Sequence, residues 1–444
     1  MPFAELGTLW SAPVAEGGPG AAYYRPVAMT ILAVAGRIGP VPIHLLALVL
    51  HCASTFALVY LFRTLRAPLL GAIVFAVHPL AGEVLGWASA LPDALAVALT
   101  LGALVWSTRP TLNVVLLLLA ILSKETAAVM AAGLLLACGS GRGPWIRWAL
   151  AVVVAMSLRV AAGVGSLPIS FDKLELVPSA LGWGWGAVVW PLPLHVVRDV
   201  TVSPPEVVIM GWLVIAAAAW RSGRSREAWA GLLLFISAFL VALPVVLDGY
   251  LLGARYAYPA LVGVGLWLAA IAPRWGRGVV LVLGMPSLVF HSVDSQRWRD
   301  DLALFDGVEE RAYGSGLAWH LWGVVNLEAS QFVVAATALE KAMASDHPYP
   351  GDDTLCIAAW VSAGNPRRAL EVAENGQKDG LTASHLAWWA RAAWGAGEVD
   401  RARGLLEHLR TPTGFDGPEW VPSFAAVVFK ADPATPRSSP QVWP

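Results

Sequence analysis

The chain has 444 residues, of which 57% are hydrophobic and only 14% are charged, and its mean hydropathy is +0.62. Soluble domains carry about a quarter charged residues, so this composition excludes an ordinary soluble protein and predicts a multi-pass membrane protein. Residues 1–293 contain 17 Lys/Arg and 11 Asp/Glu, whereas residues 294–444 contain 13 and 20. We expect the first part to lie in the membrane and the acidic second part to be soluble. No clustered basic face points to nucleic acid.

Residues 1–26 are rich in glycine and proline and show no signal peptide. We expect them to form an extracytoplasmic N-terminal segment, in line with the charges of the loops that follow them. Apolar runs then predict an all-α, polytopic membrane domain over residues 27–293, although several are shorter than the ~20 residues that a spanning helix needs. The ten runs lie near 40–62, 68–80, 91–107, 111–123, 125–139, 145–163, 205–220, 227–247, 256–272 and 278–293.

The charges in the loops predict the orientation of this domain. One set of connections is short and basic, whereas the alternate set holds mixed polar residues, and the positive-inside rule places the basic set in the cytoplasm. The basic and the polar connections alternate along the chain if residues 174–193 do not cross the membrane. Its glycines and prolines, with Trp183, Trp185 and Trp190, favour an interfacial or re-entrant helix with indoles at headgroup level. We therefore expect the polar loops and the soluble tail outside the cytoplasm.

Several polar side chains stand next to apolar runs in the outer connections. His78, Glu83 and Asp93, with Trp87 among them, lie between two such runs. Charged groups beside a bilayer core are costly, so they suggest a functional site. The other candidates of this kind are Arg25, Lys124, Glu125, Arg198, Asp199, Arg255 and Tyr256.

Each candidate also has a purely structural interpretation. A polar residue at the water boundary can end a helix, form a local ion pair or anchor the chain at the headgroups without any chemical task. The alternatives are a helix cap at His78, wet-interface positions at Glu83 and Asp93, a helix end at Lys124-Glu125, an ion pair at Arg198-Asp199 and a headgroup anchor at Arg255 with Tyr256 and Tyr258.

The soluble part, residues 294–430, contains a repeated pattern. Six residues have the spacing of a tetratricopeptide repeat, a helix–turn–helix unit of about 34 residues: Trp319, Trp322, Gly323, Ala335, Leu339 and Ala342. The small residue recurs at Ala369 and Ala402, and Gly364 and Gly397 each precede it by five residues. We predict an α–α solenoid of three degenerate repeats whose concave surface binds a protein partner.

The remaining features are less informative. Residues 431–444 are rich in proline and serine, which predicts a disordered tail. Cys52, Cys138 and Cys356 lack the spacing of a disulfide framework or a metal site, so we expect buried thiols and no metal or cofactor.

Six short motifs occur in a specific order. They are Tyr24-Arg25-Pro26, His78-Pro79 with Glu83 and Trp87, Leu122-Ser123-Lys124-Glu125-Thr126, Trp190-Pro191 with Arg198-Asp199, Arg255-Tyr256-Ala257-Tyr258-Pro259, and Trp298-Arg299-Asp300. In this order and spacing the chain, from about residue 23 to 410, resembles the multi-pass O-mannosyltransferase-like proteins. Those proteins join a GT-C-type glycosyltransferase membrane domain to tetratricopeptide repeats.

The resemblance implies an inverting glycosyltransferase of the plasma (inner) membrane. Such an enzyme moves a sugar from a polyprenyl-phosphate donor to a protein hydroxyl or a glycan on the extracytoplasmic face. A carboxylate deprotonates the acceptor hydroxyl, and cations hold the phosphate leaving group, so no metal is required. We expect catalytic carboxylates at Glu83 and Asp93, phosphate contacts at Lys124, Arg198 and Arg255, and further site residues at Arg25, His78, Glu125, Asp199 and Tyr256.

Two departures from the family pattern leave alternatives open. The family usually has a further helix and an outer loop with an acidic base before this point, whereas no aspartate precedes Asp93 here, so we favour a true start upstream of Met1. Ala254 stands where the family commonly has a glutamate that orients the following arginine. A non-catalytic membrane scaffold whose repeats recruit partners is the second hypothesis. A lipid-linked sugar transporter or polymerase is the third.

Overall fold

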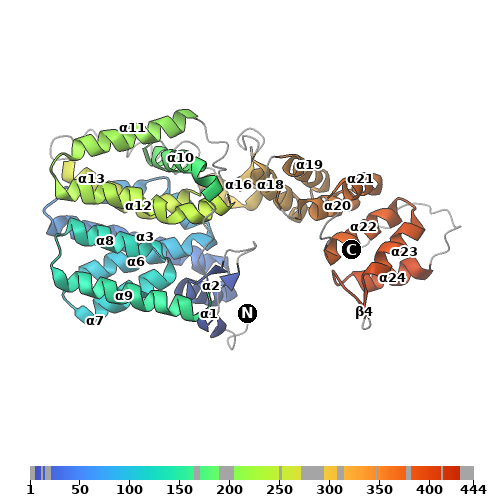
Figure 1. Cartoon of the computed structure of the whole chain (residues 1–444), viewed down its shortest axis with the longest axis horizontal. Coiled ribbons are helices and arrows are strands. Elements are labelled where there is room, and N and C mark those ends of the chain that lie inside the picture. Colours follow the sequence, from blue (N-terminus) through green and yellow to red (C-terminus); the bar gives the residue numbers. More distant parts are fainter. Residues whose placement is uncertain are drawn as a thin grey trace. The chain divides into compact units, whose positions relative to one another are not determined.

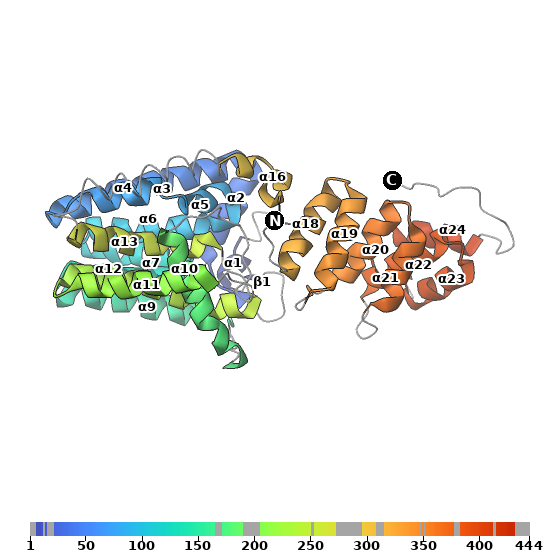
Figure 2. The same cartoon turned by 90° about the horizontal axis from the view of Figure 1, so that it is seen from above.

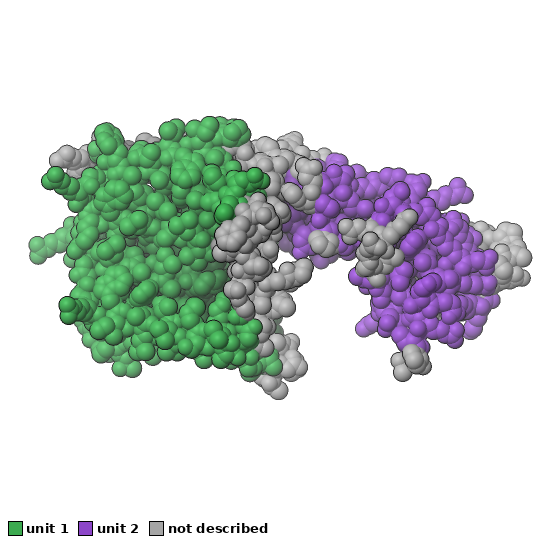
Figure 3. Space-filling view, viewed as in Figure 1, with its two compact units in different colours: residues 1–299 green, residues 300–444 purple. Residues whose placement is uncertain are grey.

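The computed structural model describes residues 6–11, 14–15, 22–164, 171–189, 205–249, 253–271, 295–307, 315–345, 348–349, 351–376, 382–411 and 414–430. Over these ranges the chain is helical apart from two pairs of two-residue strands, so the prediction of an all-α fold is confirmed. It divides into two compact units, Met1–Arg299 and Asp300–Pro444, each with its own hydrophobic core (Figure 3).

Unit 1 is a bundle whose long helices lie side by side along one direction (Figures 1 and 2). Pro26, Pro40 and Pro110 begin three of them, where the fixed φ of proline suits a helix and its missing N–H needs no partner. The helices are α1 (Thr8–Ser11), α2 (Pro26–Ile38), α3 (Pro40–Thr64), α4 (Leu70–Val77), α5 (Ala81–Gly86), η2 (Ala88–Ala90), α6 (Leu91–Val105), α7 (Pro110–Ser123), α8 (Thr126–Ala137), α9 (Arg142–Ala161), η3 (Phe171–Leu176), α10 (Val177–Val189), α11 (Pro205–Ser222), α12 (Arg226–Gly249), η5 (Ala254–Ala257), α13 (Tyr258–Ile271) and η8 (Ser295–Arg299). Strands β1 (Val14–Ala15) and β2 (Ala22–Tyr23) pair antiparallel.

Four helical stretches among the described residues are long and apolar enough to cross a membrane: Pro40–Thr64, Ala88–Val105, Arg142–Ala161 and Pro205–Ser222. Shorter apolar helices such as α7 and α8 accompany them. The last apolar run, 278–293, lies outside the described residues, and the expectation of about ten spans stays a prediction.

Glycines hold α13 between two neighbouring helices. A Cβ atom built on Gly263 would lie 2.6 Å from the carbonyl oxygen of Gly231 in α12, and one on Gly265 would lie 3.0 Å from the carbonyl oxygen of Gly71 in α4. Small residues let helix backbones approach this closely, as is typical of helix packing in membranes. The position of α13 is therefore set on two sides by backbone contacts.

The α10 helix differs from the sequence expectation. Its 13 residues are too few to span, and Trp183 and Trp185 are buried in the core rather than exposed on the surface of the bundle. The cause lies in the glycines that suggested a broken, interfacial segment. Gly182 packs against the backbone of Gly211 in α11, so these glycines bring α10 into the bundle instead of interrupting it.

Unit 2 is built from consecutive helices that pack on one another in chain order (Figure 2). They are α16 (Asp301–Phe305), α18 (Gly316–Glu328), α19 (Phe332–Met343), α20 (Asp352–Ser362), α21 (Pro366–Asn375), α22 (Ala383–Gly395), α23 (Val399–His408) and α24 (Val421–Lys430). A short antiparallel pair, β3 (Arg410–Thr411) with β4 (Gly414–Phe415), precedes the last helix.

Three turns in unit 2 repeat the same backbone geometry. Ser330, Gly364 and Gly397 have positive φ values of 60°, 75° and 89°. In each turn the next N–H donates to the carbonyl five residues earlier, as from Asn365 to Trp360 at 2.9 Å, which is the bond of a Schellman cap. The alanines five residues after the three turn residues are all fully buried. The sequence interval of 34 and 33 residues thus corresponds to a repeated structural unit.

We expect Gly263→Ala to lower the stability of the bundle by about 1–3 kcal/mol, because the added methyl group meets backbone atoms that cannot move aside. The apparent melting temperature of the full-length protein in detergent measures this loss. Gly102→Ala is the control, because its Cβ would meet only a Leu116 side-chain carbon at 3.9 Å. Alanine is the better helix former, so that variant should match or exceed the native protein. Equal melting temperatures in both variants would contradict the close packing.

Candidate functional site

The first element of the candidate site is a contact between Glu83 and Arg255. Glu83 lies in the six-residue helix α5, and one carboxylate oxygen accepts the backbone N–H of Arg255 at 3.0 Å. Its other oxygen lies 3.7 Å from Arg255 Nη1, which is an ion pair but longer than a hydrogen bond. Glu83 therefore supplies the arginine-orienting carboxylate that Ala254 does not.

Two aromatic rings complete the surroundings of Arg255. Its guanidinium carbon lies 4.5 Å from the ring centroid of Trp87 and 5.3 Å from that of Tyr256. These distances are typical of cation–π contacts, which fix the plane of the guanidinium group without occupying its N–H donors. The Arg255 side chain is still 24% exposed.

The second element is the buried pair of Lys124 and Asp93. Asp93 lies in the first turn of α6, and Lys124 is the residue at which α7 ends. Lys124 Nζ donates to both carboxylate oxygens, at 2.6 and 2.7 Å, and the side chains are only 4% and 2% exposed. A buried charge must be paired in this way, because an isolated one would cost several kcal/mol.

The third element is a two-bonded pair of Arg25 and Glu125. Arg25 precedes α2, and Glu125 lies between α7 and α8. Arg25 donates from Nη2 at 2.8 Å and from Nε at 3.2 Å to the two oxygens of Glu125. This fork geometry is the strong form of the arginine–carboxylate contact. Glu125 is 31% exposed, more than Glu83 or Asp93.

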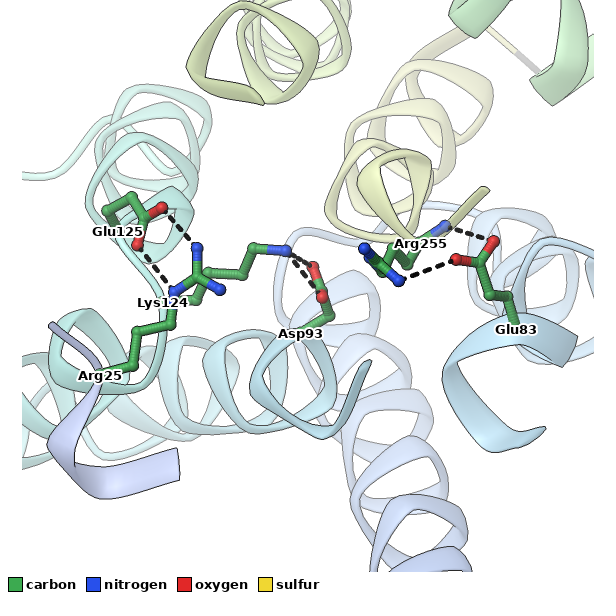
Figure 4. Close-up of polar contacts among 6 residues, drawn as sticks. All are labelled: Arg25, Glu83, Asp93, Lys124, Glu125 and Arg255. Carbon is green, nitrogen blue, oxygen red and sulfur yellow. Dashed lines mark hydrogen bonds and ion pairs between the residues drawn. The ribbon is translucent and has the colours of Figure 1, made fainter. Parts of the chain in front are cut away.

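The three pairs are neighbours. Figure 4 shows Lys124 and Asp93 between the Arg25 pair and the Arg255 pair. Asp93 interacts electrostatically with both arginines, and Tyr256 lies within cation–π distance of Lys124 as well as Arg255. The site therefore has three cations and three carboxylates, whose charges balance, and its accessible members are Arg255 and Glu125.

His78 occupies a different position from the ion pairs. Its Nε2 lies 2.8 Å from the carbonyl oxygen of Val188, and its Nδ1 lies 3.3 Å from the N–H of Leu80. Both contacts are to backbone groups, which fits the interpretation of His78 as a helix cap. Arg198 and Asp199 lie outside the described residues.

Sequence reasoning missed two histidines near this site and gave no partner for Tyr258, which it named only within a motif. His44 and His51, both on α3, and Tyr258, the first residue of α13, make polar contacts at helix ends close to Glu83 and Arg255. The available signal was two histidines seven residues apart, and hence on one face, in an otherwise apolar run. The described residues contain no cluster of three His, Cys, Asp or Glu side chains that could hold a metal ion.

No protein-family model, curated protein or solved structure matches this chain.

We expect Lys124→Met to destabilise the protein by about 3–5 kcal/mol, because it leaves Asp93 buried without a partner. The double variant Lys124→Met/Asp93→Leu should recover most of that loss, since it removes both charges. Chemical denaturation of the full-length protein in detergent measures the difference. The exposed pair Arg226–Glu227 is the control, and Arg226→Met should cost less than about 1 kcal/mol. A double variant as unstable as Lys124→Met alone would contradict this account of the pair.

Proposed function

We propose that the protein is a membrane glycosyltransferase that moves a sugar from a polyprenyl-phosphate donor to a protein hydroxyl or a glycan on the extracytoplasmic face. Four helices long enough to span a membrane support a site beside the bilayer, where the lipid donor resides. Three neighbouring cations support an anionic ligand. The family resemblance of the sequence motifs supports the reaction type.

The single observation that carries the proposal is the state of Arg255. Its backbone is held by Glu83 and its guanidinium plane by Trp87 and Tyr256, yet the second Glu83 oxygen lies 3.7 Å from Nη1, beyond hydrogen-bond distance. The group is thus oriented and partly exposed, and it retains donor capacity. A phosphate leaving group needs a cation of this kind, because negative charge develops on its oxygens as the sugar departs.

The other two pairs support the same site in different ways. Lys124 is held by both carboxylate oxygens of Asp93, so this pair is neutral as a whole and supports the site by fixing the start of α6 against the end of α7. Glu125 is the most exposed carboxylate of the three, so we add it to Glu83 and Asp93 as a candidate base for the acceptor hydroxyl. Arg198 and Asp199 remain candidates from the sequence.

For unit 2 we propose tetratricopeptide repeats that bind the protein acceptor or a partner. The three equivalent turns and the buried alanines that follow them support this assignment. The scaffold hypothesis is the second candidate function. The mutual burial of Lys124 and Asp93 favours it, because a buried and neutral pair also serves purely to hold helices together.

We expect Arg255→Ala to lower sugar transfer by about 100-fold or more, because one oriented donor to the leaving group is lost. The assay is transfer of radiolabelled sugar from polyprenyl-phosphate donors in membranes. Arg255→Lys should recover part of the activity, and Glu83→Gln should lower it by about tenfold, because the arginine loses its charged partner.

Arg109→Ala is the matched control, because Arg109 also lies over an indole ring, that of Trp106 at 5.1 Å, but outside the three pairs. It should retain full transfer. Full transfer by both Arg255→Ala and Glu83→Gln would contradict the site. A native protein that transfers sugar from no donor would leave the scaffold as the better account.

The proposed orientation is tested separately by thiol labelling in intact cells. With Cys52 and Cys138 replaced by alanine, we expect Val333→Cys in unit 2 to react with a membrane-impermeant reagent, and Thr108→Cys in a basic loop to react only after lysis. Cys356 is not a suitable reporter, because it is buried and desolvation raises the pKa of its thiol to about 12. Labelling of Val333→Cys only after lysis would contradict the orientation.

A further inference from the structure

Three histidines contact carbonyl oxygens in the last turns of other helices. His51 Nε2 lies 3.2 Å from the Ala76 oxygen in α4, His44 Nδ1 lies 3.0 Å from the Leu85 oxygen in α5, and His78 Nε2 lies 2.8 Å from the Val188 oxygen in α10. The last four carbonyls of a helix have no partner within that helix. Each histidine therefore satisfies a backbone group that an apolar bundle would otherwise leave unpaired.

The contacts determine the tautomer of His51. A carbonyl oxygen only accepts, so the Nε2 of His51 must carry the proton that it donates to Ala76. In the neutral ring Nδ1 is then an acceptor, and the Tyr258 hydroxyl, 2.9 Å away, donates to it. His51 and Tyr258 are both buried, and both rings pack on Phe75 of α4, at centroid distances of 5.1 and 5.3 Å. One imidazole thus links α3, α4 and α13.

The His44 contact holds the Glu83 side of the Glu83–Arg255 pair, and the His51 contact holds the Arg255 side. His44 holds the end of α5, the helix that carries Glu83. His51 holds Tyr258, three residues after Arg255. A helix of six residues is too short to be stable by itself, so its position depends on such contacts. The positions of Glu83 and Arg255 therefore both depend on contacts with α3.

We infer that His44 and His51 are positioning residues, which hold the Glu83 helix and the start of α13 so that Glu83 orients Arg255. The two histidines are seven residues apart on α3 and lie on the same side of it. The structural part of this inference is independent of the activity. Its consequence for sugar transfer rests on the proposed function.

Hydrogen–deuterium exchange of the full-length protein in detergent tests the structural part. His51→Leu removes both contacts, whereas His51→Gln keeps an N–H donor and an oxygen acceptor. We expect His51→Leu to speed exchange about fivefold at the amides of residues 254–257, with His51→Gln close to the native protein. Cys52→Leu is the matched control, because Cys52 is the neighbouring residue and is exposed, and it should leave exchange unchanged.

Two further variants keep the test decisive if His51→Leu does not fold. Tyr258→Phe removes only the hydroxyl group and should speed exchange at 254–257, and His44→Leu should speed it at 81–87. Native-like exchange in both segments would overturn the inference. An equal acceleration throughout α9 would also overturn it, because that would indicate a general loss of stability rather than a local positioning role.

The transfer assay separates this inference from the proposed function. If the protein is the proposed enzyme, we expect His51→Leu to lower transfer and His51→Gln to restore most of it. Altered exchange together with no transfer by the native protein would contradict the proposed function alone. Native transfer rates in His51→Leu, despite altered exchange, would overturn the positioning role.

Discussion

The cost of burying charge in an apolar helical bundle governs the polar region of unit 1. Six charged side chains lie there, and each cation faces a carboxylate. The pairs differ in tightness, from 2.6 Å between Lys124 and Asp93 to 3.7 Å between Arg255 and Glu83. A tight pair stabilises the bundle, and a loose one leaves its cation able to bind another anion. One physical requirement thus produces a tight pair at Lys124–Asp93 and a loose one at Arg255–Glu83.

The six charged residues of the three pairs all lie in short helices or at helix ends. Glu83 lies in the short α5, Lys124 and Glu125 lie between α7 and α8, and Arg255 lies in η5. An interruption frees backbone groups that need partners, and in this bundle side chains from neighbouring helices supply them. Asn113 does the same at the end of α6, donating to the Ala103 oxygen at 2.7 Å. Polar side chains are thus needed at these interruptions, whether or not the site is reactive.

The sequence allowed prediction of the helical class, the repeat interval and the polar residues that the structure places in the three pairs. Composition and spacing are local properties, so they are visible in one chain. The choice of partners was not predictable, because Glu83 meets Arg255 across 172 positions. The burial of Trp183 and Trp185 in the core was not predictable for a related reason. Glycines suggest both helix breaks and close helix contacts, and only the packing of α10 on α11 distinguishes the two.

The unequal sequence separations of the three pairs also affect how the protein is made. Asp93 and Lys124 are 31 residues apart, so they can meet as soon as the α6–α7 hairpin has left the ribosome. Arg25 lies 100 residues before Glu125, so this pair can form once Glu125 has been synthesised, directly after Lys124. Glu83 must wait for Arg255, long after its own helix has entered the bundle. During that interval its carboxylate lacks the Arg255 backbone N–H from which it accepts a hydrogen bond in the finished bundle, so α5 is anchored to η5 only at the end of the synthesis of the unit.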